Sequence, residues 1–193
     1  HLRRPHSPYD PAAAMKVPFE SACQLAGGSQ DARLKFVDNL ENKSLPPAEQ
    51  KHAVHLYQAN LATEDRELEP LLAALRARDD ALVVVLADHG EAFGQHGWYG
   101  HNMMLFGESI DIPFMIAGPG IAPGVDTSPV CTVDVLPTLV DLCGLAPPAT
   151  RGAGISLRGR LLGGEIEVTR DPVVISGRYS STGNVRVLGV IHG

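Results

Sequence analysis

The sequence predicts an α/β fold in which a mostly parallel central sheet is flanked by helices. Residues 81–87 form a continuous apolar run without alternation, which is typical of a strand buried on both faces of a parallel sheet. The predicted elements follow in the order helix, buried strand, glycine-rich loop, short helix, strand and helix. Since one strand of this type cannot build a doubly wound sheet, we expect a partial domain, incomplete at the N-terminus and at the C-terminus.

The first half of the chain is predicted to contain one long helix. Residues 1–18 carry four prolines, which favour an extended loop, and the segment that follows gives little signal. Proline is tolerated in the first turn of a helix, so Pro46 and Pro47 are expected to open a helix that runs to Ala77 along a stripe of leucines. Pro70 is expected to kink this helix or to split it.

The second half is predicted to alternate loops with short elements. The expected elements are a loop over 88–100, helices over 102–109 and 130–143, and strands over 113–117, 173–176 and 185–191. Thr132 is the expected N-cap of the helix over 130–143, and Gly144 is its expected C-cap. We place a domain boundary near residue 160, with a smaller strand region beginning over 161–193.

Composition limits the classes of partner. The 193 residues are 44% hydrophobic and carry a net charge of −6, which suits one globular domain and disfavours nucleic acid as a partner. No apolar run approaches the roughly 20 residues that a membrane-spanning helix needs. Oligomeric state stays open, as does the compartment, with bacterial cytoplasm, periplasm and secretion all compatible.

Asp88 and His89 are the first polar residues after the apolar run 81–87. Ligands gather at the carboxyl ends of strands in open α/β sheets, and a carboxylate with an imidazole is an ordinary ligand pair for a divalent cation. The alternative is that Asp88 caps the next turn and His89 is a structural loop histidine. Taken alone, so short a motif does not decide between the two.

Further motifs extend along the chain in a fixed order. They are Pro5-His6-Ser7-Pro8-Tyr9, Asp88-His89-Gly90-Glu91, His96-Gly97, Gly100-His101, Glu108 to Pro113, Gly118-Pro119-Gly120, Val133 to Leu139, Gly144-Leu145 and Gly154 to Leu157. This series resembles the bacterial sulfatases of the alkaline phosphatase superfamily and covers most of residues 1–160. The resemblance implies the alkaline-phosphatase-like sandwich fold and a small-molecule or carbohydrate sulfate ester as substrate.

The resemblance also implies roles for four residues. Asp88 and His89 would be ligands of one divalent metal ion, with Ca²⁺ as the first expectation and Mn²⁺ as the alternative because His89 supplies nitrogen. His6 would contact the ester oxygen and assist the leaving group. His101 would stand where many relatives carry a lysine that grips the sulfuryl oxygens. An imidazole can donate the proton that a departing alkoxide needs, and cationic groups stabilise the remaining charge.

Other residues of the loop have a structural and a functional interpretation. His96 is expected to support the site rather than to act in it, and Glu91 is expected to satisfy backbone N–H groups of the loop. Trp98 and Tyr99 either line a substrate pocket or pack the loop.

The expected nucleophile is not in the sequence. Relatives convert a Cys or Ser in a C/S-x-P-x-R motif into formylglycine, and none of Cys23, Cys131 and Cys143 begins such a motif. We therefore expect the nucleophile and two further metal ligands to lie upstream of His1, and this chain alone to be inactive and to bind metal poorly. The alternatives are a phosphodiesterase, phosphonate monoester hydrolase or phosphoethanolamine transferase of the same superfamily, or an inactive remnant.

Overall fold

The computed structural model describes His6, Tyr9 and residues 47–97, 99–101, 105–149, 152–164, 173–179 and 185–191. The chain divides into two compact units. Unit 1 comprises His1–Arg78, His89–Asn102 and Phe106–Asp111, and unit 2 comprises Asp79–Asp88, Met103–Leu105 and Ile112–Gly193. None of the helices in the described ranges is long and apolar enough to cross a bilayer.

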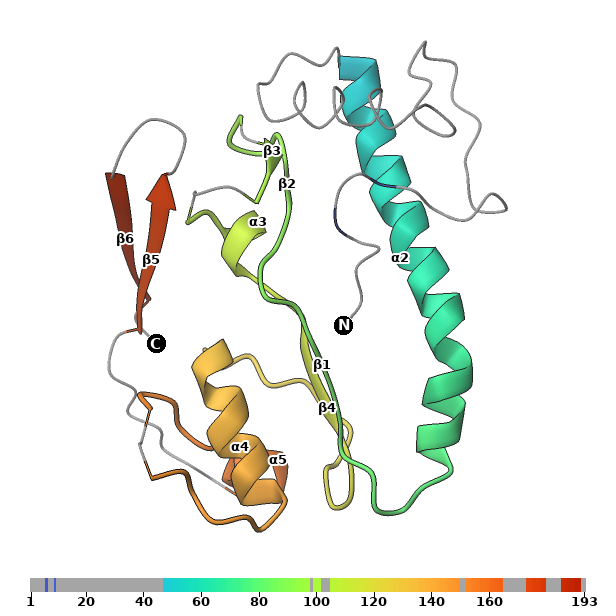
Figure 1. Ribbon diagram of the computed structural model, residues 1–193, viewed down its shortest axis with the longest axis vertical. Helices are drawn as coiled ribbons and strands as arrows, with labels where there is room; N and C mark the ends of the chain where they lie inside the picture. The colour runs from blue at the N-terminus through green and yellow to red at the C-terminus, as the bar shows by residue number, and fades with distance from the viewer. Residues whose placement is uncertain are drawn as a thin grey trace. The chain divides into compact units, whose positions relative to one another are not determined.

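Helix α2 (Pro47–Arg76) is the long helix that the paired prolines predicted (Figure 1). It runs through Pro70 without a break, so the predicted split is wrong. Pro70 is exposed, and the carbonyl group that loses its N–H partner there can be hydrated instead. The leucine stripe is buried at Leu56, whereas Leu61 and Leu71 are 42% and 55% exposed. Burial is thus concentrated in the N-terminal half of the helix.

The core of unit 1 is an aromatic cluster around Tyr9. The ring of Tyr9 lies 5.7 Å from that of Tyr57 on α2 and 6.1 Å from that of Phe93 (centroid distances), and Tyr57 and Phe93 are 5.0 Å apart. Ala53, Leu56 and Tyr99 complete the cluster. Edge and tilted contacts of this kind stabilise beyond the area they bury. They fasten Tyr9 to α2 and to the loop that follows Asp88.

That loop folds as a short hairpin. Strand β2 (Ala92–Phe93) pairs with strand β3 (Tyr99–Gly100) in antiparallel register, with Ala92 opposite Gly100. The turn needs left-handed backbone at Gly94 and Gly97, with φ values of 97° and 73°, as the glycine-rich sequence predicted. Helix α3 (Gly107–Ile110) is shorter than the helix expected over 102–109, of which residues 102–104 lie outside the described ranges.

Glycine is required at position 90 because the backbone at Glu108 lies very close to it, and not because of its φ value. Its N–H donates to the carbonyl oxygen of Ser109 at 2.8 Å. A Cβ at Gly90 would overlap the carbonyl oxygen of Glu108. Only glycine therefore allows the chain beyond His89 to lie against α3 in this way.

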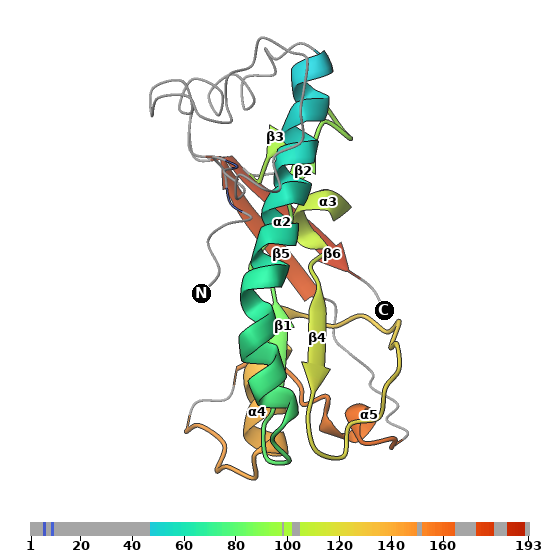
Figure 2. The same ribbon diagram turned by 90° about the vertical axis from the view of Figure 1, so that its right-hand side faces the viewer.

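Strand β1 (Val83–Leu86) pairs with strand β4 (Phe114–Ala117), as Figure 1 and Figure 2 both show. The pairing is antiparallel, with Val83 opposite Ala117. The prediction of a strand buried on both faces within parallel neighbours is wrong for the described residues, where β1 is only partly buried and Leu86 is 41% exposed. A strand is buried on both faces only when it has strands on both sides and layers that cover the sheet. In unit 2 the described neighbour of β1 is β4.

The helix expected over 130–143 begins with a 3₁₀ turn, η2 (Thr132–Asp134), which is capped by Cys131 rather than by Thr132. Helix α4 (Val135–Leu142) follows, and its C-cap is Cys143 rather than the predicted Gly144, which comes one residue later with a left-handed φ of 64°. A short helix α5 (Arg158–Leu161) comes next. The two predicted C-terminal strands form an antiparallel pair, β5 (Val173–Tyr179) and β6 (Val185–Ile191).

Buried polar groups of α4 hold the segment before α5. The carboxylate of Asp134 is fully buried and accepts the N–H groups of Cys131 at 2.8 Å and Ile155 at 3.0 Å. The Thr138 hydroxyl donates to the Asp134 carbonyl at 2.6 Å and accepts the N–H of Leu157 at 3.0 Å. Buried polar groups are stable only when they are hydrogen-bonded in this way. These motif residues therefore have a structural role.

Candidate active site

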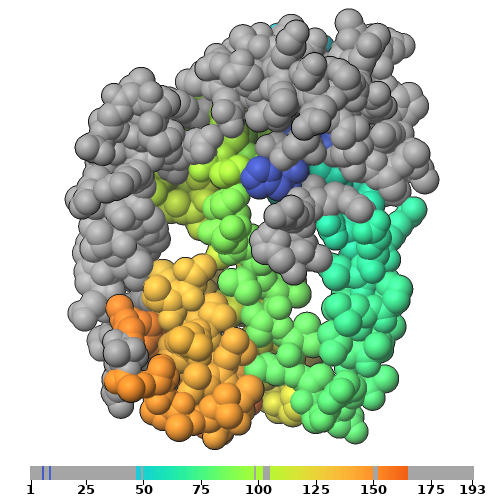
Figure 3. All heavy atoms as spheres, in the orientation of Figure 1, coloured from blue at the N-terminus to red at the C-terminus, as the bar shows by residue number. Residues whose placement is uncertain are grey.

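Three imidazole rings gather in unit 1. The ring of His101 stacks on that of His89, with a centroid distance of 4.0 Å and an angle of 19°. The ring of His6 meets His101 edge-on, at 5.0 Å and 65°. In Figure 3 the described N-terminal residues, in blue, lie against the green segment that carries His89 and His101. The structure thus brings together residues that stand more than 80 positions apart in the sequence.

Tyr9 is a second described residue of the N-terminal motif, and it is anchored in the core of the same unit. It lies three residues after His6 and is 96% buried between α2 and the hairpin, since only 4% of it is exposed. Burial raises the pKa of Tyr9 far above its usual range, and the nearby Glu91 carboxylate adds to the rise. The phenol is therefore neutral at any physiological pH and serves as an anchor.

The hydrogen bond of His89 determines which ring nitrogen can bind a ligand. Its Nδ1 lies 2.8 Å from the carbonyl oxygen of Gly90. Because a carbonyl oxygen can only accept, Nδ1 must carry the proton, and Nε2 then holds the lone pair of the neutral ring. Metal-binding histidines in proteins usually donate their other N–H to a carbonyl or carboxylate in this manner.

Asp88 ends unit 2 and is joined to His89, the next residue of unit 1, by a peptide bond. A carboxylate and an imidazole at consecutive positions fit one divalent cation by donor type. Within the described part of the chain, no group of three or more His, Cys, Asp or Glu side chains is placed to hold a metal ion. The assignment of Asp88 and His89 as two ligands of a metal ion therefore stays a prediction based on donor type.

Glu91 has a partner that the sequence did not predict. One of its carboxylate oxygens lies 3.4 Å from Nδ1 of His101, and 7% of its side chain is exposed. The expectation that Glu91 accepts N–H groups of the loop stays a prediction.

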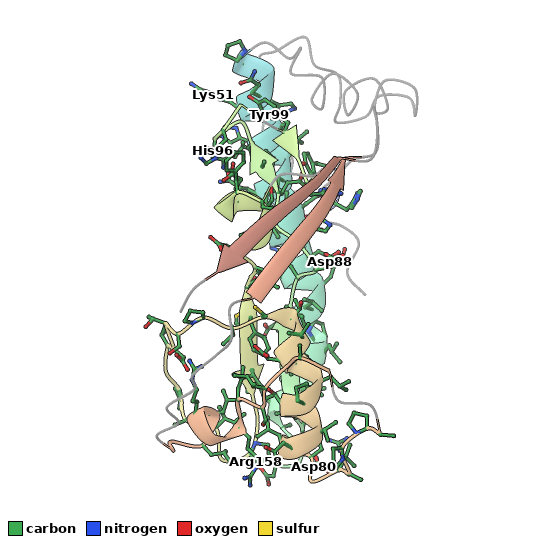
Figure 4. All side chains as sticks on the ribbon, turned by 90° about the vertical axis from the view of Figure 1, so that its left-hand side faces the viewer. Lys51, Asp80, Asp88, His96, Tyr99 and Arg158 are labelled. Carbon is green, nitrogen blue, oxygen red and sulfur yellow. The ribbon has the colours of Figure 1, made fainter. Side chains whose placement is uncertain are left out.

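His96, which is labelled in Figure 4, contacts Phe106 and Glu108. Its Nδ1 lies 2.7 Å from a carboxylate oxygen of Glu108, and its ring stacks on Phe106 with a centroid distance of 4.0 Å. The structural interpretation of His96 is thus the one that the contacts favour. Tyr99 packs against the core of unit 1, and Trp98 lies outside the described residues.

The pair of His96 and Glu108 predicts an acid-sensitive contact. The hydrogen bond from His96 lowers the pKa of Glu108 below its usual value. A carboxyl group with a lowered pKa in the folded state stabilises above its unfolded pKa, and this contribution is lost as pH falls through the lowered value. In carboxyl NMR titrations, we expect Glu108 to titrate below about 4.3, the ordinary value for glutamate. The His96→Ala variant should return it to that value, and an unchanged titration would contradict the contact.

Comparison with known proteins places these features in a family. The sulfatase family profile matches residues 1–145. The Delta 4,5-hexuronate-2-O-sulfatase of Bacteroides thetaiotaomicron is 35% identical over 139 residues, which are 67% of this chain and 28% of that protein. The chain therefore spans less than a third of the length of this relative.

Comparison with solved structures leads to the same family. A putative sulfatase from Bacteroides thetaiotaomicron matches 92% of this chain and 38% of its own, with a TM-score of 0.65 and 25% identity. The phosphonate monoester hydrolase of Silicibacter pomeroyi matches 78% of this chain and 33% of its own, with a TM-score of 0.63 and 27% identity. These matches confirm the alkaline-phosphatase-like α/β fold as a partial domain, although the described strand pairs are antiparallel. The chain belongs to the sulfatase family.

Proposed function

We propose that this chain carries the metal-binding and oxyanion-binding part of a sulfuric ester hydrolase, and that its nucleophile is a formylglycine supplied by a segment preceding His1. The observation that carries the proposal is the cluster of His6, His89 and His101, whose rings lie 4.0–5.0 Å apart in neighbouring pairs. Family membership supports the reaction class. The short share of the relatives' length that the chain covers supports a nucleophile outside it.

Each residue has a chemical task in this proposal. Asp88 and Nε2 of His89 are two ligands of a divalent cation, Ca²⁺ or Mn²⁺, and such an ion withdraws negative charge from sulfuryl oxygens when bound. Nε2 of His101 binds a sulfuryl oxygen, where a donor stabilises developing charge. His6 donates a proton to the ester oxygen of the leaving group, as a general acid. The stacked contact between His89 and His101 supports this division, because it brings the ligand ring and the oxyanion-binding ring side by side.

The proposed substrate is a small-molecule or carbohydrate sulfate ester. The similarity to a hexuronate sulfatase supports the carbohydrate class. The net charge of −6 is compatible with an anionic substrate, since a few local donors and one cation determine the potential of a site.

Hydrolysis of an aryl sulfate tests the proposal. We expect the 193-residue chain alone to show no turnover and to bind metal poorly, because two ligands make an incomplete cage. We expect the protein expressed with its preceding segment to hydrolyse the aryl sulfate. Turnover by the chain alone would show that the nucleophile is within it. A longer protein that hydrolyses no sulfate ester would contradict the proposed reaction.

A phosphonate monoester hydrolase is the second candidate. The structural likeness to the enzyme from Silicibacter pomeroyi supports it, since that enzyme matches 78% of this chain. Parallel assays with an aryl sulfate and an aryl phosphonate separate the two functions. A higher kcat/KM for the phosphonate would assign the chain to this second class.

A further inference from the structure

The helical segment formed by η2 and α4 buries polar side chains and exposes apolar ones. Asp134 and Thr138 are fully buried, where they hold the segment before α5. Val133 and Leu136 are instead 50% and 60% exposed. A surface helix of a globular protein usually shows the opposite distribution, with its apolar stripe toward the core. The apolar side of this segment is therefore available to another element.

The exposed apolar side chains lie on one face. Val133 comes three residues before Leu136, and Val140 comes four residues after it. Cys143 follows Val140 by three residues, and side chains three or four positions apart are neighbours on a helix surface. Beyond the helix, the N–H of Leu145 donates to the carbonyl oxygen of Val140 at 2.9 Å, a bond of the Schellman type that brings these two side chains together. Leu145 is 63% exposed and Cys143 is an exposed free thiol, so these five residues form one partly exposed surface, the α4 apolar face.

The charges of this segment disfavour a membrane as the partner. Residues 131–145 contain no Lys or Arg, and their charged residues are Asp134 and Asp141. Helices that lie in a membrane surface usually carry Lys and Arg opposite their apolar face, where these residues meet anionic lipids. The negative potential of such a surface repels an acidic helix.

The size of the face disfavours a second copy of the chain. Helix α4 has eight residues, and a helix of that length is about 12 Å long. A stable dimer usually buries about 800 Å² on each partner. One face of so short a helix supplies only a fraction of that area, so it fits a place within a larger core better than a dimer interface.

The comparison with solved structures indicates where such a core would come from. The putative sulfatase from Bacteroides thetaiotaomicron matches 92% of this chain but only 38% of its own, so most of that protein lies outside the match. An apolar helix face in an α/β fold is buried against another layer of the same domain. We infer that the α4 apolar face is the docking surface for an apolar element of the segment that precedes His1. The inference rests on the function proposed above, which supplies that segment.

The thiol of Cys143 is a natural probe of this face. N-ethylmaleimide alkylates an exposed thiol readily, whereas a covered thiol reacts only when the structure opens. Labelling is compared between the 193-residue chain and the protein expressed with its preceding segment, and peptide mass spectrometry separates Cys143 from the two other cysteines. We expect Cys143 to be labelled at least about tenfold more slowly in the longer protein.

Thr127→Cys is the matched control, because Thr127 is exposed in the same unit but outside the α4 apolar face. Position 127 should be labelled at the same rate in both proteins. Equal rates for Cys143 in the two proteins would overturn the inference, and so would an equal slowing at both positions. Turnover by a longer protein whose Cys143 is unprotected would overturn only the docking surface. Protection of Cys143 in a longer protein that hydrolyses no sulfate ester would retain the docking surface and contradict only the proposed function.

A substitution within the face gives a second test. Leu136→Glu should leave the stability of the 193-residue chain nearly unchanged, because Leu136 is 60% exposed. In the longer protein the new charge would be buried without a partner, so we expect Cys143 to regain the labelling rate of the chain alone. Leu136→Met keeps the apolar character and should keep the protection. Intact protection in Leu136→Glu would show that the preceding segment docks elsewhere. If this variant of the longer protein does not fold, the wild-type comparison decides.

Discussion

Replacing Asp134 with alanine should lower the free energy of unfolding of unit 2 by about 3–5 kcal/mol, the range expected when a buried charged acceptor is removed. The Asp134 side chain is fully buried and accepts two backbone N–H groups, from Cys131 and Ile155. Alanine would leave both donors without their acceptor and would open space in the packing. Denaturant unfolding of the wild-type and variant chains measures the difference.

Asp141 provides the matched control on the same helix. Its carboxylate accepts the Ser156 hydroxyl at 2.7 Å, so it also contacts the segment that α4 holds, but this contact is exposed. Asp141→Ala should therefore cost less than about 1 kcal/mol, as is usual for exposed polar contacts. Equal losses in the two variants would show that the buried network does not stabilise unit 2 as described.

The second large effect concerns catalysis. In the active protein that contains this chain, His101→Ala should lower kcat by about 10²–10³-fold, the cost of removing one donor from an oxyanion site. The reason is the position of the ring between His89 and His6, with its Nδ1 engaged by Glu91. Steady-state hydrolysis of an aryl sulfate measures the loss.

His55→Ala is the control for this substitution. His55 is an exposed imidazole on α2, in the same unit but outside the ring cluster. We expect its kcat to stay within a factor of about two of wild type, because surface substitutions away from a site have small effects. Equal losses in both variants, or no loss in His101→Ala, would remove His101 from the reaction.

Local patterns in the sequence predicted the elements better than their pairing. The start of α2 at paired prolines and the stop of α4 shortly before Gly144 follow from backbone chemistry within a few residues. The antiparallel partner of β1 is 28 or more residues away, and an apolar run such as 81–87 does not reveal whether its neighbour will be parallel. Pro70 does not split α2, because a proline on an exposed helix face loses one hydrogen bond, which water can replace.

The same contrast between local motifs and distant contacts holds for the candidate site. Motif order pointed to His6, His89 and His101, and the structure brings these three rings together. The contact between Glu91 and His101 could not be predicted, because it depends on how the short hairpin folds, which the glycine-rich sequence permits in several ways. The network around Asp134 could not be predicted from the sequence either, because the Asp134 carboxylate and the Ile155 N–H that it accepts are 21 residues apart.

We propose that the imidazole cluster lies beside the binding site of a divalent cation. Imidazole NMR of the chain during titration with Mn²⁺ tests it most directly, because a paramagnetic ion broadens the signals of nearby nuclei even when it binds weakly. Broadening at low Mn²⁺ should affect His89 first and then His101 and His6, while His52 and His55 on α2 stay sharp. Uniform broadening of all eight histidines, or broadening of His52 and His55 first, would contradict the site.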